Sequence, residues 1–150
     1  MCLCAVIPLA GCASFAPPPY PPPQRAQPAP VTQAFIEAAL AMQGEPYRYG
    51  GDSPGGFDCS GLVRYAATRA GVPVPRTARA QLNAGTSVPR EQIQAGDLVF
   101  MRLPVKLHVG IVTSAGAFVH APATGGRVRV DQLDAPPYRN GFIGARRIIP

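Results

Sequence analysis

Hydrophobic and polar positions repeat with a helical period after the proline-rich start of the chain. Over residues 33–43 apolar side chains recur on one face, which predicts a helix with Thr32 as its N-cap and Gly44 as its stop. Residues 60–70 show the same periodicity and are followed by Gly71, a residue that suits the end of a helix. The pattern therefore predicts two amphipathic helices in the first half of the chain.

The rest of the chain predicts mostly strands. Residues 46–57 are rich in glycine and proline and are expected to form a loop, and a short helix is expected over residues 77–84. Strands are predicted over residues 97–101, 107–113, 117–120, 127–130 and 141–149, with the second and third forming a hairpin. Because the helices precede the strands, the order favours an α+β fold over an alternating α/β fold.

The chain divides into three parts. Residues 1–12 are a short apolar segment that ends Leu9-Ala10-Gly11-Cys12 and resembles the lipobox of bacterial lipoproteins. That resemblance implies acylation of Cys12, and Ala13 directly after it implies sorting to the periplasmic face of the outer membrane. Residues 13–30 are a proline-rich linker, and residues 31–150 are expected to form a single folded domain.

Charge and cysteine content limit the possible partners and the possible roles of the cysteines. The formal net charge is +6, but the basic residues are scattered, which argues against a nucleic-acid partner. Diffuse positive charge suits an anionic envelope polymer or an acidic membrane surface. Three of the four cysteines lie in the leader, so the domain holds only Cys59 and cannot form an internal disulfide.

Cys59 stands where a reactive thiol is expected. A glycine-rich loop leads to it, and it enters the predicted second helix, where the partial positive charge of the helix N-terminus would favour the thiolate. A nucleophilic cysteine needs a base, normally histidine, and a group that orients the base. The chain has two histidines, His108 and His120, and both fall in the predicted hairpin.

The register of the hairpin decides whether these histidines can cooperate. If Thr113 pairs with Ala117, His120 lies opposite Gly110 and both histidines project from the same face, because side chains alternate along a strand. A two-residue loop without a bulge would put them on opposite faces. The loop must therefore be odd in length or bulged, and Gly116 suits the left-handed position of such a turn.

Six motifs occur in an order that resembles the NlpC-type family of cell-wall cysteine peptidases, over about 115 residues. They are Pro46-Tyr47-Arg48-Tyr49-Gly50-Gly51, Phe57-Asp58-Cys59-Ser60-Gly61-Leu62-Val63, Pro75-Arg76-Thr77-Ala78, Ala95-Gly96-Asp97-Leu98-Val99-Phe100, His108-Val109-Gly110-Ile111 and Phe118-Val119-His120-Ala121. The resemblance implies a papain-like α+β fold, in which N-terminal helices pack on a central antiparallel sheet.

The resemblance also implies roles for individual residues. Cys59 would be the nucleophile, His108 the base, His120 the orienting residue, and Tyr47 an oxyanion donor beside the backbone N–H of Cys59. Four further residues would line the substrate site, the first two by holding the free amino end of the stem peptide: Asp58, Ser60, Arg76 and Thr77.

These roles predict a cysteine endopeptidase that cuts peptidoglycan stem peptides between γ-D-glutamate and diaminopimelate and needs no cofactor. The motifs leave open cleavage of the D-alanyl–diaminopimelate cross-link, and relatives of the wider fold include amidases and acyltransferases. A non-catalytic lipoprotein that binds peptidoglycan remains an alternative. A metal site built from Cys59, His108 and His120 is a further alternative that the residue types allow, although no metal is expected.

Overall fold

The computed structural model describes residues 28–104, 106–123 and 125–149. The predicted lipobox with Cys12, and the linker as far as residue 27, lie outside the described residues. Within the described ranges no helix is both long enough and apolar enough to cross a membrane.

A six-stranded antiparallel sheet forms the centre of the fold, in the order β3-β8-β4-β5-β6-β7. The strands are β3 (Thr86–Val88), β4 (Leu98–Leu103), β5 (Lys106–Ser114), β6 (Ala117–His120), β7 (Arg129–Gln132) and β8 (Phe142–Arg147). A separate two-stranded hairpin consists of β1 (Asp52–Ser53) and β2 (Gly56–Phe57).

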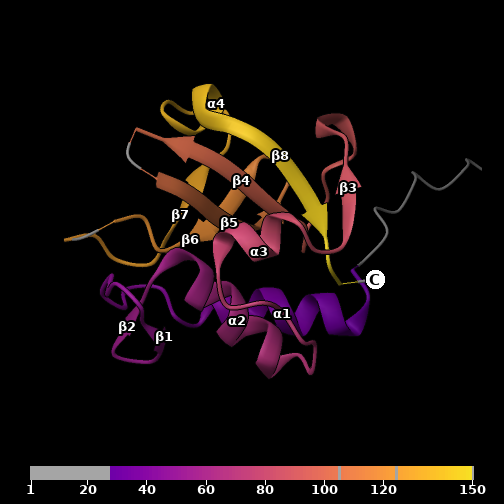
Figure 1. The fold of residues 1–150 in the computed structure, drawn as a ribbon. Coiled ribbons are helices and arrows are strands. Elements are labelled where there is room, and N and C mark those ends of the chain that lie inside the picture. Colours follow the sequence, from indigo (N-terminus) through magenta and orange to yellow (C-terminus); the bar gives the residue numbers. More distant parts are fainter. Residues whose placement is uncertain (1–27, 105, 124, 150) are drawn as a thin grey trace, which may run out of the picture.

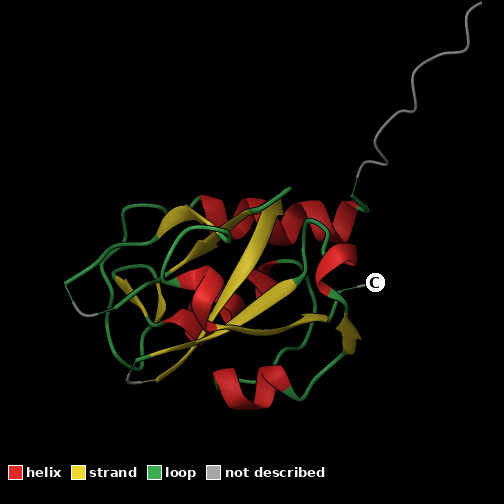
Figure 2. Ribbon diagram, turned by 90° about the horizontal axis from the view of Figure 1, so that it is seen from above, coloured by secondary structure: helices red, strands yellow, loops and turns green. Residues whose placement is uncertain are grey.

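Helices lie on both sides of the sheet. They are α1 (Pro30–Leu40), α2 (Cys59–Arg69), α3 (Ala78–Leu82) and α4 (Tyr138–Gly141), with a 3₁₀ turn over Arg90–Gln92. Figure 1 shows α1 and α2 on one side and α4 on the other, and Figure 2 shows the fold from above, with strands and helices overlapping in projection. The predicted α+β, papain-like fold is confirmed.

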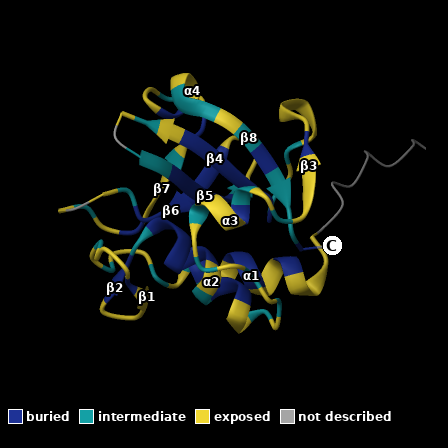
Figure 3. Cartoon of the chain, in the orientation of Figure 1, coloured by how far each residue is buried: buried dark blue, intermediate teal, exposed yellow. Residues whose placement is uncertain are grey.

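Two hydrophobic cores result from the alternation of side chains along the central strands. Val109 and Ile111 of β5 pack with Leu62 and Val63 of α2 in the larger core. On the other face, Phe118 packs with Tyr138 of α4, with β4 and β8 residues completing the smaller core. In Figure 3 the buried residues concentrate in the central strands and in the helix faces turned toward them.

The helix predicted over residues 33–43 begins and ends earlier than expected. It starts at Pro30, which occupies the first turn, where its fixed φ and missing N–H carry no penalty. Thr32 is therefore a buried residue inside the helix, and its prediction as the N-cap is wrong. The chain leaves the helix after Leu40 through turns that end at Gly44, whose φ is +90°.

Other predicted elements differ in smaller ways. The helix predicted over residues 60–70 is α2, one residue earlier, and the helix predicted over residues 77–84 is the shorter α3. The predicted loop over residues 46–57 contains the β1–β2 hairpin, whose strands of two residues each are too short to show alternation. Strand β7 begins two residues later than predicted, and β3 and α4 were not predicted.

The hairpin between β5 and β6 has the register that the histidines require. Ile111 pairs with Val119, as expected, whereas Ser114 pairs with Ala117 across a two-residue turn. The register of the strand pair shifts between Val112 and Ser114, and this shift makes both pairings possible, so the hairpin is bulged. Gly116 has a φ of +78°, the left-handed conformation predicted for it.

Candidate active site

Cys59 is the first residue of α2 and is 8% exposed. Asp58 caps the helix with its carboxylate, which accepts the N–H of Gly61 at 2.6 Å. Gly61 allows the glycine-rich loop to lie directly on this first turn, because a Cβ there would clash with the carbonyl oxygen of Gly51. The loop and the cap together fix the backbone that carries the thiol.

Both predicted histidines are fully buried and in contact. Nε2 of His108 lies 2.8 Å from Nδ1 of His120, and the two rings meet edge to face. Because β6 ends at His120, the first residues of β5 extend past the end of that strand. Cys59 lies against this extension, where the backbone N–H of Val109 acts on its sulfur as a hydrogen-bond donor.

A carboxylate lies within hydrogen-bond distance of the second histidine and extends the pair to a series of three residues. Oδ2 of Asp131, on β7, lies 3.0 Å from Nε2 of His120 and also accepts hydrogen bonds from the hydroxyl of Tyr138 at 2.6 Å and from Nε of Arg129 at 2.9 Å. Although burial works against ionisation, these hydrogen bonds lower the pKa of Asp131 to about 2. Asp131 is therefore a carboxylate, and only an acceptor, at neutral pH.

The carboxylate determines the tautomers of both histidines. His120 must donate its Nε2–H to Asp131, which leaves its Nδ1 as an acceptor. His108 must then donate its Nε2–H to His120, which leaves the lone pair of its own Nδ1 unused. That buried Nδ1 has no hydrogen-bond partner among the described residues, so the pair presents one free base.

The thiol and the base are both neutral in the resting site. Burial raises the pKa of the Cys59 thiol, and the N–H groups of Val109 and Ser60 and the charge of Lys106 only partly oppose this. Burial, together with His120 and Lys106, lowers the pKa of His108 to about 3. The thiolate expected at the helix N-terminus is therefore not the resting form, because the cost of removing charge from water is larger than the helix effect.

This ionisation state predicts how Cys59 reacts with iodoacetamide. A raised thiol pKa means that the proton is kept to higher pH, so the alkylation rate should still be rising from about pH 6 to about pH 10. Mass spectrometry of the Cys59 peptide isolates this thiol from the three leader cysteines. A rate that levels off at about pH 5–8 would indicate a preformed thiolate–imidazolium pair instead. Slow alkylation at neutral pH is thus no sign of a dead site.

Tyr47 reaches the site from the segment before β1. Its backbone N–H donates to the carbonyl of Gly126 at 2.8 Å, and it forms an isolated bridge with Phe57 next to the Asp58 cap. Its hydroxyl accepts a hydrogen bond from Nζ of Lys106 at 2.9 Å. The structure thus brings Tyr47 together with the start of β5, two residues before His108.

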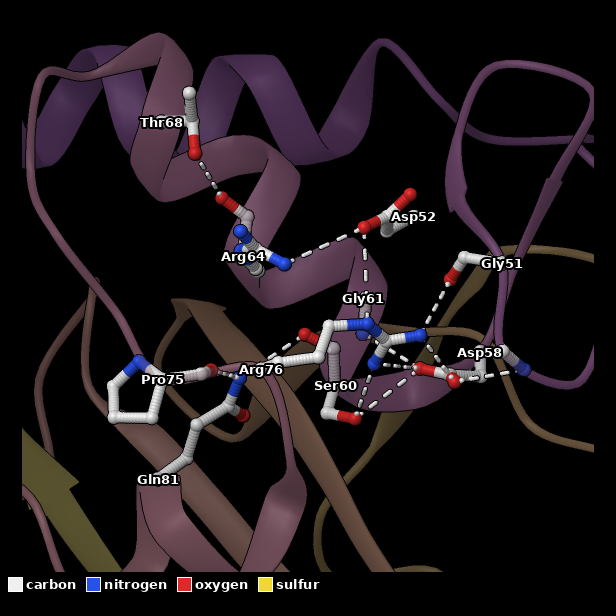
Figure 4. A network of polar contacts seen from close by, with 11 residues as sticks. Gly51, Asp52, Asp58, Ser60, Gly61, Arg64, Thr68, Pro75, Arg76 and Gln81 are labelled. Carbon is white, nitrogen blue, oxygen red and sulfur yellow. Dashed lines mark hydrogen bonds and ion pairs between the residues drawn. The ribbon is translucent and has the colours of Figure 1, made fainter.

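Three of the four residues predicted to bind substrate, Asp58, Ser60 and Arg76, belong to one polar network around the start of α2 (Figure 4). Arg76 donates to both carboxylate oxygens of Asp58, at 3.0 and 2.7 Å, and to the hydroxyl of Ser60 at 3.1 Å. Thr77 caps α3 by accepting the N–H of Ala80 at 3.2 Å. The fold therefore uses all four side chains.

Asp58 is fully engaged within this network. Its carboxylate also accepts the N–H groups of Gly50 and Gly61 and the hydroxyl of Ser60. Although partial burial opposes ionisation, the hydrogen bonds from Arg76 and Gly61 lower its pKa. A substrate amine would have to compete with these donors, and the role of Asp58 and Ser60 in holding an amine stays a prediction.

The sequence did not indicate three residues of the site: Asp131, Tyr138 and Lys106. Asp131 and Tyr138 belong to none of the six sequence motifs, and the strand predicted over residues 127–130 ends one residue before Asp131. The signal that could have identified Asp131 is register, since it pairs with Phe118 and so lies on the same face as His120.

The geometry does not favour the metal alternative. His108 and His120 donate and accept between themselves, so one nitrogen of each ring is already used. Within the part of the chain that the structure describes, no group of three or more His, Cys, Asp or Glu side chains is arranged to hold a metal ion.

The fold and the site define a class: a papain-like domain with a buried thiol at a helix start and a buried, hydrogen-bonded histidine pair on the central sheet. A family model described as "NlpC/P60 family" matches residues 44–147. The chain belongs to the NlpC/P60 family, a family of peptidoglycan endopeptidases.

Individual relatives are similar over most of this chain. The murein DD-endopeptidase MepH of Escherichia coli is 35% identical over 126 residues, 79% of this chain and 46% of the relative. The γ-D-glutamyl-L-lysine dipeptidyl-peptidase of Bacillus cereus is 32% identical over 127 residues, 82% of this chain and 38% of the relative. This chain thus spans less than half the length of either.

Solved structures agree on the fold. The crystal structure of an NlpC/P60 family protein from Bacillus cereus has a TM-score of 0.76 at 31% identity, covering 82% of this chain and 42% of its own. The peptidoglycan hydrolase RipB from Mycobacterium tuberculosis has a TM-score of 0.70 at 33% identity, covering 80% of this chain and 65% of its own.

Proposed function

We propose that this chain is a cysteine endopeptidase that hydrolyses peptidoglycan stem peptides at the γ-D-glutamyl–diaminopimelate bond. The observation that carries the proposal is the hydrogen-bonded series Asp131, His120, His108, which ends in a free imidazole nitrogen on the residue next to Val109, a core neighbour of Cys59. A base that is oriented by further hydrogen-bonded groups is what activates a nucleophilic cysteine. The names of the relatives supply the substrate class.

The first half of the reaction forms an acyl-enzyme. His108 Nδ1 takes the thiol proton as Cys59 Sγ adds to the amide carbon, and the carbonyl oxygen becomes an oxyanion. The Cys59 N–H and the Tyr47 O–H are the proposed donors to that oxyanion. When the C–N bond breaks, His108 returns the proton to the departing amine and leaves a thioester.

The second half releases the product. His108, neutral again, takes a proton from water as the water oxygen adds to the thioester carbon. Collapse of this second oxyanion breaks the C–S bond, and the proton returns to the sulfur. The carboxyl product leaves and the neutral thiol–imidazole pair is restored, which matches the resting ionisation state of the site.

Asp131 should contribute through the tautomer of His120. We expect Asp131→Ala to lower kcat on the order of 100-fold, because His120 loses its acceptor together with Arg129 and Tyr138. Asp131→Asn should cost only about tenfold, since one amide oxygen can replace Oδ2, on which all three donors converge. Steady-state kinetics on a purified muropeptide measures both.

A matched control for the Asp131 variants is Asp134→Ala. Asp134 is exposed and, among the described residues, pairs only with Arg90, so its loss should leave kcat unchanged. If Asp131→Ala retained the wild-type kcat, or if Asp131→Asn were as slow as Asp131→Ala, the proposed tautomer role would be wrong.

A second candidate bond is the D-alanyl–diaminopimelate cross-link, which the name of MepH favours. Two purified substrates separate the candidates: an uncross-linked disaccharide tetrapeptide and a cross-linked dimer of it. A γ-D-glutamyl–diaminopimelate endopeptidase would shorten the tetrapeptide to a dipeptide stem. A cross-link endopeptidase would leave the tetrapeptide intact and split the dimer into monomers.

We further propose that Cys12 carries a lipid that anchors the enzyme at the periplasmic face of the outer membrane. The support is the sequence Leu9-Ala10-Gly11-Cys12 followed by a proline-rich linker. Fractionation of cells that produce the wild type and Cys12→Ser tests it. Loss of the protein from the membrane fraction in the variant is expected, and an unchanged distribution would contradict the anchor.

A further inference from the structure

Lys106 is the only lysine in the chain, which otherwise carries its positive charge on arginine. It is the first residue of β5 and lies two residues before His108. Its side chain is half-buried, and its Nζ lies 4.6 Å from the centroid of the Tyr47 ring. The sequence motifs gave no role to this residue, yet it lies within the candidate active site.

The hydrogen bond between Lys106 and Tyr47 has only one possible direction. An ammonium group has three donors and no acceptor, so the phenol oxygen must accept from Nζ at 2.9 Å. The O–H of Tyr47 is thereby left to donate, and no protein acceptor for it is found among the described residues. A cation on the oxygen also withdraws electron density and makes that O–H a stronger donor.

The charge of Lys106 is not neutralised by the protein. All eight Asp and Glu side chains lie in the described part of the chain, and none forms an ion pair with it. Lys106 lies two residues before His108 on β5, and its charge lowers the pKa of His108 and partly opposes the rise in the pKa of Cys59. An unneutralised ammonium polarises the hydroxyl to which it donates more strongly than a paired one would.

We infer that Lys106 is a positioning residue for the reaction, which holds and polarises the Tyr47 hydroxyl so that its O–H donates to the oxyanion. The inference rests on the proposed peptidase function, because it needs an oxyanion at Cys59. It makes one of the proposed oxyanion donors, Tyr47, dependent on a neighbouring cation.

Another role for Lys106 would be an ion pair with a carboxylate of the stem peptide. The two roles predict different kinetics. A polarised Tyr47 acts only as the oxyanion forms, so its loss lowers kcat with little change in KM. A pair with a substrate carboxylate is present in the bound substrate too, so its loss raises KM, and amidating that carboxylate removes the effect.

A double-mutant cycle on a purified muropeptide tests the inference. Lys106→Met keeps the length of the side chain and removes the charge, and should lower kcat about tenfold with KM within about twofold. Tyr47→Phe should lower kcat about 100-fold. In the Tyr47→Phe background, Lys106→Met should change kcat by less than about twofold, because the group through which it acts is already gone.

The matched control is Arg69→Met, which removes one positive charge at the far end of α2 and should leave kcat and KM unchanged. Three outcomes would overturn the inference: equal loss from Lys106→Met in both backgrounds, a loss confined to KM, or a fully active Lys106→Met enzyme. If the wild type itself cleaved no muropeptide, the proposed function would fail instead, so the two failures are distinguishable.

Discussion

Replacement of Cys59 with alanine should reduce hydrolysis of a purified stem peptide to the background rate. The sulfur is the atom that forms the acyl-enzyme, and no other described cysteine can replace it. Loss of the nucleophile in hydrolases of this design costs on the order of 10⁶-fold in kcat. The measurement is the steady-state release of product, followed by chromatography.

The effects of a Cys59 substitution on stability and on catalysis can be measured separately. Removing one buried sulfur should cost about 1 kcal/mol of unfolding free energy, so Cys59→Ala should remain folded. Cys59→Ser restores most of the volume but not the nucleophile, and should be almost as inactive. A folded Cys59→Ala protein with more than about a hundredth of the wild-type rate would exclude Cys59 as the nucleophile.

Replacement of His120 should give the second largest effect, and its size should depend on the substituent. His120→Ala removes the acceptor that holds the Nε2–H of His108, so His108 can turn or adopt the wrong tautomer. A wrong tautomer in a catalytic triad costs on the order of 10⁴-fold in kcat. We therefore expect His120→Ala to lose about 10³-fold or more in kcat.

His120→Asn should lose much less kcat than His120→Ala. Its side-chain oxygen occupies nearly the place of Nδ1 of histidine, 2.8 Å from Nε2 of His108. An acceptor at that place keeps His108 in the productive tautomer, so kcat for His120→Asn should lie within about tenfold of the wild type. Equal rates for His120→Ala and His120→Asn would show that His120 has only a packing role.

Thermal unfolding provides the control for both His120 variants. His120 is fully buried against the rings of Phe118 and Tyr138, so alanine leaves a cavity there. The rates should therefore be compared well below the melting temperature of the less stable variant. A loss of kcat that followed stability alone would point to packing and away from the tautomer.

Sequence patterning identified much of the fold and the centre of the site. Alternation along β5 and β6 placed both histidines on one face, and the required bulge is present between Val112 and Ser114. The alternation of side chains was enough for this result. The face on which a side chain lies depends on its register along the strand and not on which residue it pairs with. The position of Cys59 at a helix start followed from the glycine-rich loop before it.

Long-range contacts and burial could not be predicted in the same way. Asp131 and Lys106 reach the site from β7 and the first residue of β5, and no local pattern marks them. The ionisation state also depends on burial, which a sequence does not display. The helix N-terminus favours a thiolate at Cys59, but burial outweighs that effect and keeps the thiol neutral.

The most direct test of the account is digestion of purified peptidoglycan by the wild type and by Cys59→Ala, with mass analysis of the soluble fragments. The wild type should release fragments whose masses correspond to cleavage between γ-D-glutamate and diaminopimelate, and Cys59→Ala should release none. Identical fragment profiles from the two proteins would contradict it.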